Sequence, residues 1–324
     1  MNETRQRVKR QAQKRGAPQS ATGTGRNGRR APAKITNVQR FTYLLLLATW
    51  AVPVFGQPAA GNEASLTPAE SQALVDRALA NELKAAQDAS HPMRYQLHKT
   101  SPRFTSTKEI YETRDGEVAR LTAIGDKPLS ATDEQNEEAR LNGLLSDPGK
   151  QRHRKQAEDQ DAGRALMVLR ALPSAFLYRY AGSGEGSAGK VEKFTFRPNP
   201  SFSPPSLETE VLIQMAGEMW IDPIHERVAR LEGRLQQDVD FGWGILGRLN
   251  KGGWIAIDQA DVGDGQWRIV HFQMAMNGRV VFKTRVFDTT EEESHFAPLP
   301  PGLSYKKAIE MLREEPKGAA QNLR

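Results

Sequence analysis

The segment Gly217-Glu218-Met219-Trp220-Ile221-Asp222 (residues 217–222) is followed, after a turn, by Val228-Ala229-Arg230-Leu231-Glu232-Gly233 (residues 228–233). Both read as strands, and comparable segments rich in β-branched and aromatic residues recur between Gly, Asp and Pro. They cover residues 93–100, 104–114, 117–124, 176–180, 191–197, 208–214, 218–221, 227–235, 254–258, 266–276 and 279–287. So many short strands predict an α+β fold built on one large antiparallel sheet.

Two turns in this pattern can be interpreted more closely. Asp115-Gly116 lies between two predicted strands and is typical of a hairpin. For the last hairpin we predict a three-residue loop, Met276-Asn277-Gly278, with Gly278 in a left-handed conformation. This register separates apolar from charged faces by pairing Met274 with Val280, Phe272 with Phe282 and Val270 with Thr284.

Helices are predicted at three places. Thr67-Pro68-Ala69-Glu70 has the arrangement of a capping box with proline at the first helical position, which predicts a helix over residues 68–87. Residues 131–172 form a helical insertion, a candidate lid. Ser304 can cap a short helix at the start of a loose tail, residues 303–324. The predicted domain organisation is therefore a single sheet domain over residues 57–302, between an N-terminal leader and this tail.

The N-terminus predicts export. Residues 41–55 are uncharged and apolar, too short for a membrane-spanning helix of about 20 residues, and small residues precede a cut before Gln57. Residues 1–40 hold eleven Lys or Arg and one acid, Glu3, so residues 1–56 are a disordered basic leader plus signal peptide. We expect a periplasmic or secreted protein cleaved near Gly56/Gln57, no longer an integral membrane protein. The alternative is an N-terminal anchor in the inner membrane.

The distribution of charge bears on which partners the protein binds, and the cysteine content bears on how its fold is stabilised. The net charge of +6 comes from the leader, because residues 41–324 hold 34 basic and 38 acidic residues, or −4. The pI near 9.5 is therefore no indication of nucleic-acid binding by the mature domain. With no cysteine the chain forms no disulfide, so the domain depends on an apolar core.

No motif in the sequence predicts catalysis, a metal site or a cofactor. The G-x-G-x-x-G run at residues 184–189 precedes a strand rather than a helix, so it lacks the helix N-terminus that binds phosphate. The histidines have no metal-ligand spacing. The acidic loop at residues 258–265 could offer carboxylates to calcium, but its spacing is not that of an EF-hand and Asp264-Gly265 is typical of a turn. The acids Glu218 and Asp222 around Trp220 keep a carbohydrate-active hydrolase as a distant alternative.

Methionines and aromatic residues gather in the second half of the chain. On one face of a curved sheet they would bind acyl chains adaptably, since thioethers fill irregular gaps and need no hydrogen bonds. The other interpretation is that they form an ordinary core. The candidate ligand-binding residues are Met215, Met219, Trp220, Trp243, Trp254, Phe272, Met274 and Phe282.

The exported N-terminus, the leading amphipathic helix, the many-stranded sheet and residues 217–233 together resemble the periplasmic lipoprotein-carrier (outer-membrane lipoprotein-sorting) superfamily. The resemblance implies a half-barrel sheet closed by helices, with an apolar cavity for the lipid part of a client. The expected function is then a non-catalytic carrier for lipid or lipoprotein acyl chains, in which Trp220→Asp would unload the lipid. The alternative is an envelope protein-interaction or signalling module, which would bind a protein partner and no small ligand.

Overall fold

A computed structural model describes residues 66–314 except 188, 242–246 and 281–282. The predicted basic leader and signal peptide lie outside these residues, as do Trp243 and Phe282. Within the described part of the chain, no helix is both long and apolar enough to span a membrane. The helices are α1 (Pro68–Ala86), α2 (Ala131–Ser146), α3 (Pro148–Ala175), α4 (Leu207–Glu210), the 3-10 turn η1 (Val211–Gln214) and α5 (Tyr305–Glu314).

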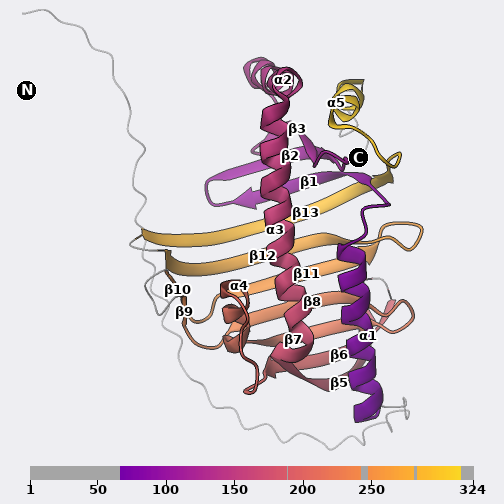
Figure 1. The fold of residues 1–324 in the computed structure, drawn as a ribbon, viewed down its shortest axis with the longest axis vertical. Helices are drawn as coiled ribbons and strands as arrows, with labels where there is room; N and C mark the ends of the chain where they lie inside the picture. Colours follow the sequence, from indigo (N-terminus) through magenta and orange to yellow (C-terminus); the bar gives the residue numbers. More distant parts are fainter. Residues whose placement is uncertain (1–65, 188, 242–246, 281–282, 315–324) are drawn as a thin grey trace, which may run out of the picture. The chain divides into compact units, whose positions relative to one another are not determined.

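The strands form one antiparallel sheet, which confirms the predicted fold class (Figure 1). Its order is β4-β3-β2-β1-β13-β12-β11-β8-β7-β6-β5, and the short strands β9 and β10 extend from β12. The strands are β1 (Met93–Ser101), β2 (Phe104–Tyr111), β3 (Val118–Ile124), β4 (Lys127–Pro128), β5 (Phe176–Gly186), β6 (Gly189–Pro198), β7 (Met215–Asp222), β8 (Arg227–Leu235), β9 (Val239–Phe241), β10 (Gly247–Leu249), β11 (Trp254–Asp261), β12 (Trp267–Val280) and β13 (Lys283–Pro298).

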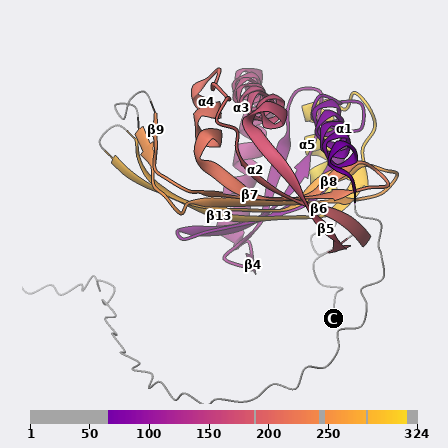
Figure 2. The ribbon, with the colours of Figure 1, turned by 90° about the horizontal axis from the view of Figure 1, so that it is seen from below.

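The helices cover one face of the sheet (Figure 2). Helix α1 begins at the capping box of Thr67 and Glu70, and its buried stripe of Leu74, Val75 and Leu79 faces the sheet. Helix α3 runs across the strands next to α1 (Figure 1). The predicted insertion is thus the two helices α2 and α3, which cross from one half of the sheet to the other.

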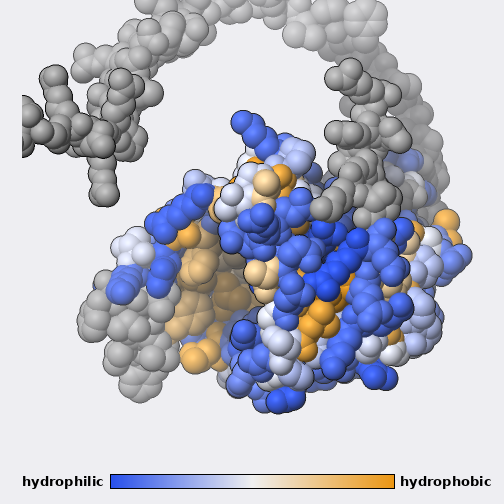
Figure 3. Space-filling view, turned by 90° about the horizontal axis from the view of Figure 1, so that it is seen from above, coloured by the Kyte–Doolittle hydropathy of each residue, from blue (hydrophilic) through white to orange (hydrophobic). Residues whose placement is uncertain are grey.

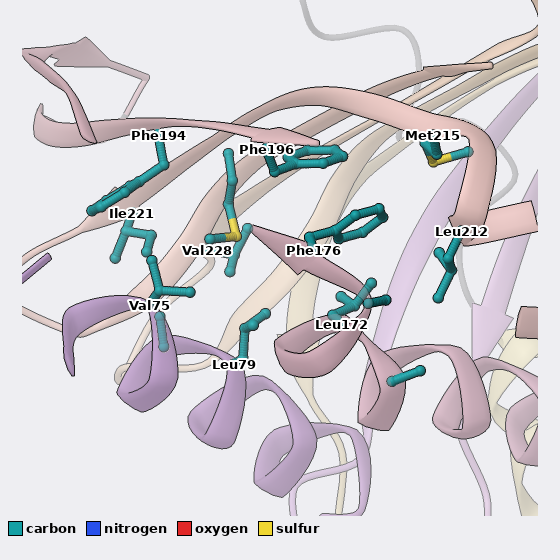
Figure 4. Packing of buried hydrophobic residues seen from close by; sticks show 14 of the residues in the cluster. Val75, Leu79, Leu172, Phe176, Phe194, Phe196, Leu212, Met215, Ile221 and Val228 are labelled. Carbon is teal, nitrogen blue, oxygen red and sulfur yellow. The ribbon is translucent and has the colours of Figure 1, made fainter. Parts of the chain in front are cut away.

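Two clusters of buried side chains lie between the helices and the sheet. The first joins α1 and the end of α3 to strands β5–β8, with Phe176 and Phe196 at a ring distance of 4.5 Å (Figure 4). The second joins α2 and α5 to the β2–β3 hairpin through residues such as Tyr111, Leu141 and Ile309. No residue belongs to both clusters.

The β2–β3 hairpin confirms the prediction at Asp115-Gly116. Strands β2 and β3 pair antiparallel, and Gly116 has a φ of +95°, which glycine adopts without strain. The carboxylate of Asp115 also accepts a hydrogen bond from the backbone N–H of Tyr305, at the start of α5, at 3.1 Å. This turn therefore anchors the C-terminal helix.

The strand predicted at residues 208–214 is wrong. The structure has α4 and η1 there, preceded by Ser206, whose backbone N–H donates to Thr209 Oγ1 at 3.1 Å. The sequence Val211-Leu212-Ile213 has high β-propensity, but this cap starts a helical turn and Leu212 is buried in the main cluster. Local capping and burial thus override the propensity.

The register predicted for the last hairpin is also wrong. Strands β12 and β13 continue past Asn277 and Gly278, which pair with Val286 and Arg285, as far as the Val280–Lys283 pair. Gly278 does not have a positive φ. Glycine is needed at this position because strand β10 approaches it closely. A Cβ atom at residue 278 would lie 2.3 Å from the carbonyl oxygen of Arg248 in β10.

Candidate functional site

An apolar cavity of about 820 Å³ lies between the helices and the concave face of the sheet. Its volume is within the range of about 300–1,000 Å³ that is usual for small-molecule sites. The space-filling view shows a hollow in which hydrophobic side chains gather (Figure 3). The apolar wall consists of Leu79, Ala85, Ala86, Ala165, Val168, Leu169, Leu172, Phe176, Phe196, Leu207, Val211, Leu212, Met215, Met219, Val228, Leu231, Phe241, Leu249, Ile255, Ile257, Trp267, Ile269 and Met276.

Strand alternation explains how the sheet contributes to this wall. In β7, residues two and four apart share a face, and Met215 and Met219 line the cavity from it. Met219 pairs with Leu231 of β8, and Leu231 pairs with Ile257 of β11, so the three side chains lie in one row across the sheet. The sequence therefore builds the wall by placing apolar residues at every second position of neighbouring strands.

Four of the predicted ligand-binding residues lie on this concave face, but Phe272 and Met274 do not line the cavity itself. Met215 and Met219 are in the cavity wall. In β12, Phe272 pairs with Ile257 and Met274 pairs with Ile255, and both partners are wall residues. The partly buried Met274 packs against the main core cluster.

Trp220 and Trp254 lie elsewhere. Each alternates with a wall residue, Met219 or Ile255, so it points to the opposite face of the sheet, and neither lines the cavity. Trp220 is covered there by Lys193, whose Nζ is 4.1 Å from the ring centroid, and by Arg230 at 5.6 Å. We therefore remove both tryptophans from the candidate site.

Sequence reasoning missed the part of the wall that the helices supply. Val168 and Leu169 of α3 and Val211 and Leu212 at α4–η1 face the cavity. For α3 a signal was present, because its apolar residues gather at the end of an otherwise charged segment. For Val211 and Leu212 the signal was concealed by the strand prediction at residues 208–214.

Glu82 of α1 fastens the helix to the sheet at one end of the cavity. Its carboxylate accepts hydrogen bonds from Arg227 at 2.8 and 3.1 Å, from the backbone N–H of Val228 at 2.9 Å and from Gln259 at 3.1 Å. The side chains of Glu82 and Arg227 are only 10% and 12% exposed. A fully hydrogen-bonded buried pair of this kind fixes the position of α1 and carries no unused charge.

A second set of polar side chains, mainly acidic, lies at the same end of the cavity. Glu112, Glu293 and Arg268 line the cavity there. Arg268 Nη2 donates to the carbonyl oxygen of His91 at 2.7 Å and lies 3.6 Å from Glu112 Oε2. Burial, together with the charges of Glu117, Glu291 and Glu112, raises the pKa of Glu293 to about 8, and Arg268 only partly offsets this. From the sequence, Glu291-Glu292-Glu293 is interpreted as a solvated acidic run, whereas the structure half-buries Glu293 in the cavity wall.

The carboxylates that suggested a hydrolase do not form a catalytic pair. Asp222 closes the β7–β8 turn by accepting hydrogen bonds from the backbone N–H groups of Ile224 and His225 at 2.7 and 2.8 Å. Burial opposes ionisation, but these bonds and the His225 ring lower the pKa of Asp222 overall. Glu218 accepts a hydrogen bond from Trp220 Nε1 at 3.3 Å, outside the cavity.

The other candidate motifs are accounted for by turns. Gly186 and Gly189 pair at the end of the β5–β6 hairpin, so the glycine-rich run precedes no helix. In the predicted acidic loop, Asp261 Oδ1 accepts from the backbone N–H of Gly263 at 2.9 Å, and Asp258 bonds to Arg230. In the described residues, no group of three or more His, Asp or Glu side chains has the arrangement of a metal site.

Comparisons with known proteins give only distant likenesses. No protein-family model matches the sequence, and no curated protein matches it. The chain is similar to a putative outer membrane lipoprotein-sorting protein domain from Vibrio parahaemolyticus, with 11% identity, 74% of this chain and 98% of that chain covered, and a TM-score of 0.26.

It is also similar to a DUF1329 family protein from Desulfovibrio piger ATCC 29098, at 10% identity over 72% of this chain and 95% of that one, with a TM-score of 0.26. A third likeness is to MucB in complex with MucA(peri), at 11% identity over 71% and 99% of the two chains, with a TM-score of 0.21. TM-scores this low carry no argument about function.

Proposed function

We propose that this protein binds a long apolar chain, such as the acyl chain of a lipid or lipoprotein, and carries it in the periplasm without catalysis. The observation that supports this is the apolar cavity of about 820 Å³ under α1, α3 and α4. A wall of aliphatic, Met and Phe side chains offers an acyl chain van der Waals contact along its length, and each buried methylene contributes about 0.8 kcal/mol.

The periplasmic location in this proposal comes from the sequence, through the predicted export signal at residues 41–56. An acyl chain that leaves a membrane must be shielded from water, and a cavity closed on one side by a sheet and on the other by helices supplies that shield. The candidate ligand site is the row of Met219, Leu231 and Ile257, together with the wall residues Met215 and Met276.

Native mass spectrometry with lipid extraction tests the proposal. The full sequence is expressed in a bacterium, and the protein is purified from the periplasm without detergent. We expect a lipid adduct of about one molecule per chain, released by organic extraction. A protein that carries no lipid and gains none after incubation with phospholipid vesicles would overturn the proposal and favour the protein-interaction module.

A further inference from the structure

The cavity has a polar end and an apolar end. Apart from Glu208 of α4, its polar wall residues lie near the end of α1, just after β2, at the beginning of β8, at the end of β11, at the beginning of β12 and in β13. The antiparallel pairing brings these positions together at one end of the strands. At the other end of the strands, Met276 near the end of β12 and Leu249 of β10 are apolar wall residues.

The charges at the polar end do not cancel. Arg227 is fully engaged by Glu82. Arg268 is placed beside Glu112, with Nη2 bonded to a backbone carbonyl. Among the carboxylates that line the cavity, Glu293 has neither a hydrogen bond nor an ion pair to any described residue. When Glu293 is ionised, the polar end therefore carries excess negative charge.

The carboxylates behind Glu293 add to this excess. Glu117 is bonded to Tyr95 Oη at 3.4 Å, and burial together with Glu158 raises the pKa of Glu117. Glu291 also faces Glu293, although Lys99 Nζ neutralises it at 2.5 Å. A negative group brought into this surrounding would be repelled, whereas a positive group would be attracted.

We propose that the ligand of the cavity is a long-chain amphiphile with a cationic amine head group, which binds with its head at Glu293 and Glu112 and its chain towards Met276 and Leu249. This inference rests on the proposed function, because it assigns the head group of the same apolar ligand. It is carried by two independent features, the apolar cavity and the uncompensated carboxylate at one end of it.

The chemistry of the head group fits this end of the cavity. An ammonium group donates up to three hydrogen bonds, and Glu293 and Glu112 offer carboxylate oxygens on neighbouring parts of the wall. Binding would give Glu293 the counter-charge that the folded protein lacks. A carboxylate or sulfate head in the same place would have only Arg268, which already lies beside Glu112.

Isothermal titration calorimetry of the full chain at pH 8 tests the inference. The two probes are dodecylamine and dodecanoate, which have chains of equal length, and each is used below its critical micelle concentration. The variants are Glu293→Gln and, as a matched control, Glu292→Gln, which removes the same charge from an exposed neighbour on the other face of β13. We expect dodecylamine to bind at least tenfold more tightly than dodecanoate. Glu293→Gln should bring the ratio close to one, and Glu292→Gln should leave it unchanged.

Retained binding of dodecanoate by Glu293→Gln shows that the variant's cavity is intact. If both probes bind the unmodified protein equally, or if Glu293→Gln leaves the ratio unchanged, the head-group assignment is overturned while the proposed apolar-chain binding stands. If neither probe binds, the proposed function itself fails.

Discussion

Met219 and Trp220 are adjacent in β7, yet Met219 lines the cavity while Trp220 lies outside it under Lys193 and Arg230. These two consecutive residues therefore point to opposite faces of the sheet. A change at each position should therefore affect different properties of the protein.

Filling the cavity should block ligand binding, and changing the opposite face should not. Ile257→Trp places a larger side chain in the wall, so we expect apolar-chain affinity to fall by about tenfold or more, or about 1.4 kcal/mol. Trp220→Asp, which the sequence predicted to unload the lipid, should now retain it. Lipid extraction from both purified variants is the measurement, and loss of lipid from Trp220→Asp alone would contradict the assignment of the two faces.

Removing the carboxylate of Glu82 should loosen α1. The change Glu82→Gln leaves the largely buried guanidinium of Arg227 without its charge partner, so we expect the free energy of unfolding to fall by about 2–4 kcal/mol. Asp76→Asn on the exposed side of α1 should change it by less than about 0.5 kcal/mol. Urea denaturation of both variants checks this, and equal stabilities would show that Glu82 does not hold the helix.

Glu293 should make stability depend on pH. Its pKa is about 8 in the folded protein against 4.5 ordinarily, so the folded state holds the proton more tightly. The contribution of Glu293 to the free energy of unfolding is therefore fully present below pH 4.5 and is lost as the pH rises through 8. Glu117, Glu291 and Glu112 face this group and raise its pKa, and Arg268 opposes them.

We expect Glu293→Gln to match the unmodified protein near pH 4.5 and to exceed its stability at pH 9 by about 1–2 kcal/mol, because one pKa unit is about 1.4 kcal/mol and solvent screening reduces the full value. The measurement is the urea midpoint of unfolding of both proteins across this pH window. A difference that does not grow with pH would exclude the raised pKa.

Gly278→Ala should strain the sheet where β10 joins β12. The new Cβ would lie 2.3 Å from the carbonyl oxygen of Arg248, so strand β10 must move, and we expect destabilisation by about 1–3 kcal/mol. Gly163→Ala is the matched control, since a Cβ there meets nothing within 4 Å and alanine favours the helix by up to about 1 kcal/mol. Thermal unfolding of both variants should therefore move in opposite directions.

The sequence was sufficient for the fold class, but the predicted ligand site combined Met219 and Trp220, which lie on opposite faces of β7. The period-two pattern places Met215 and Met219 on one face and Trp220 on the other. It does not say which face the helices cover, because that depends on contacts between distant segments. The same limit explains Glu293, which is the third acid of a charged run and looks exposed until β13 is paired with β1 and β12.

Local signals failed where a distant strand or a cap decided the structure. Asn277-Gly278 is typical of a hairpin turn, but the approach of β10 requires a glycine at residue 278 inside a longer strand. At residues 208–214 the β-branched residues favoured a strand, while Ser206 and Thr209 start a helical turn. The first outcome cannot be predicted from the neighbouring residues, whereas the second requires the capping residues Ser206 and Thr209 to be weighed against the β-propensity that follows them.

The separation of the two larger buried clusters has a structural consequence. The cluster of α2, α5 and the β2–β3 hairpin shares no buried residue with the one beside the cavity. A substitution in the core of one half therefore leaves the apolar packing of the other half intact. The two halves are held together as one domain by the continuous sheet and by α3, which packs on α1 at one end and bonds to the β2–β3 turn through Gln151 at the other.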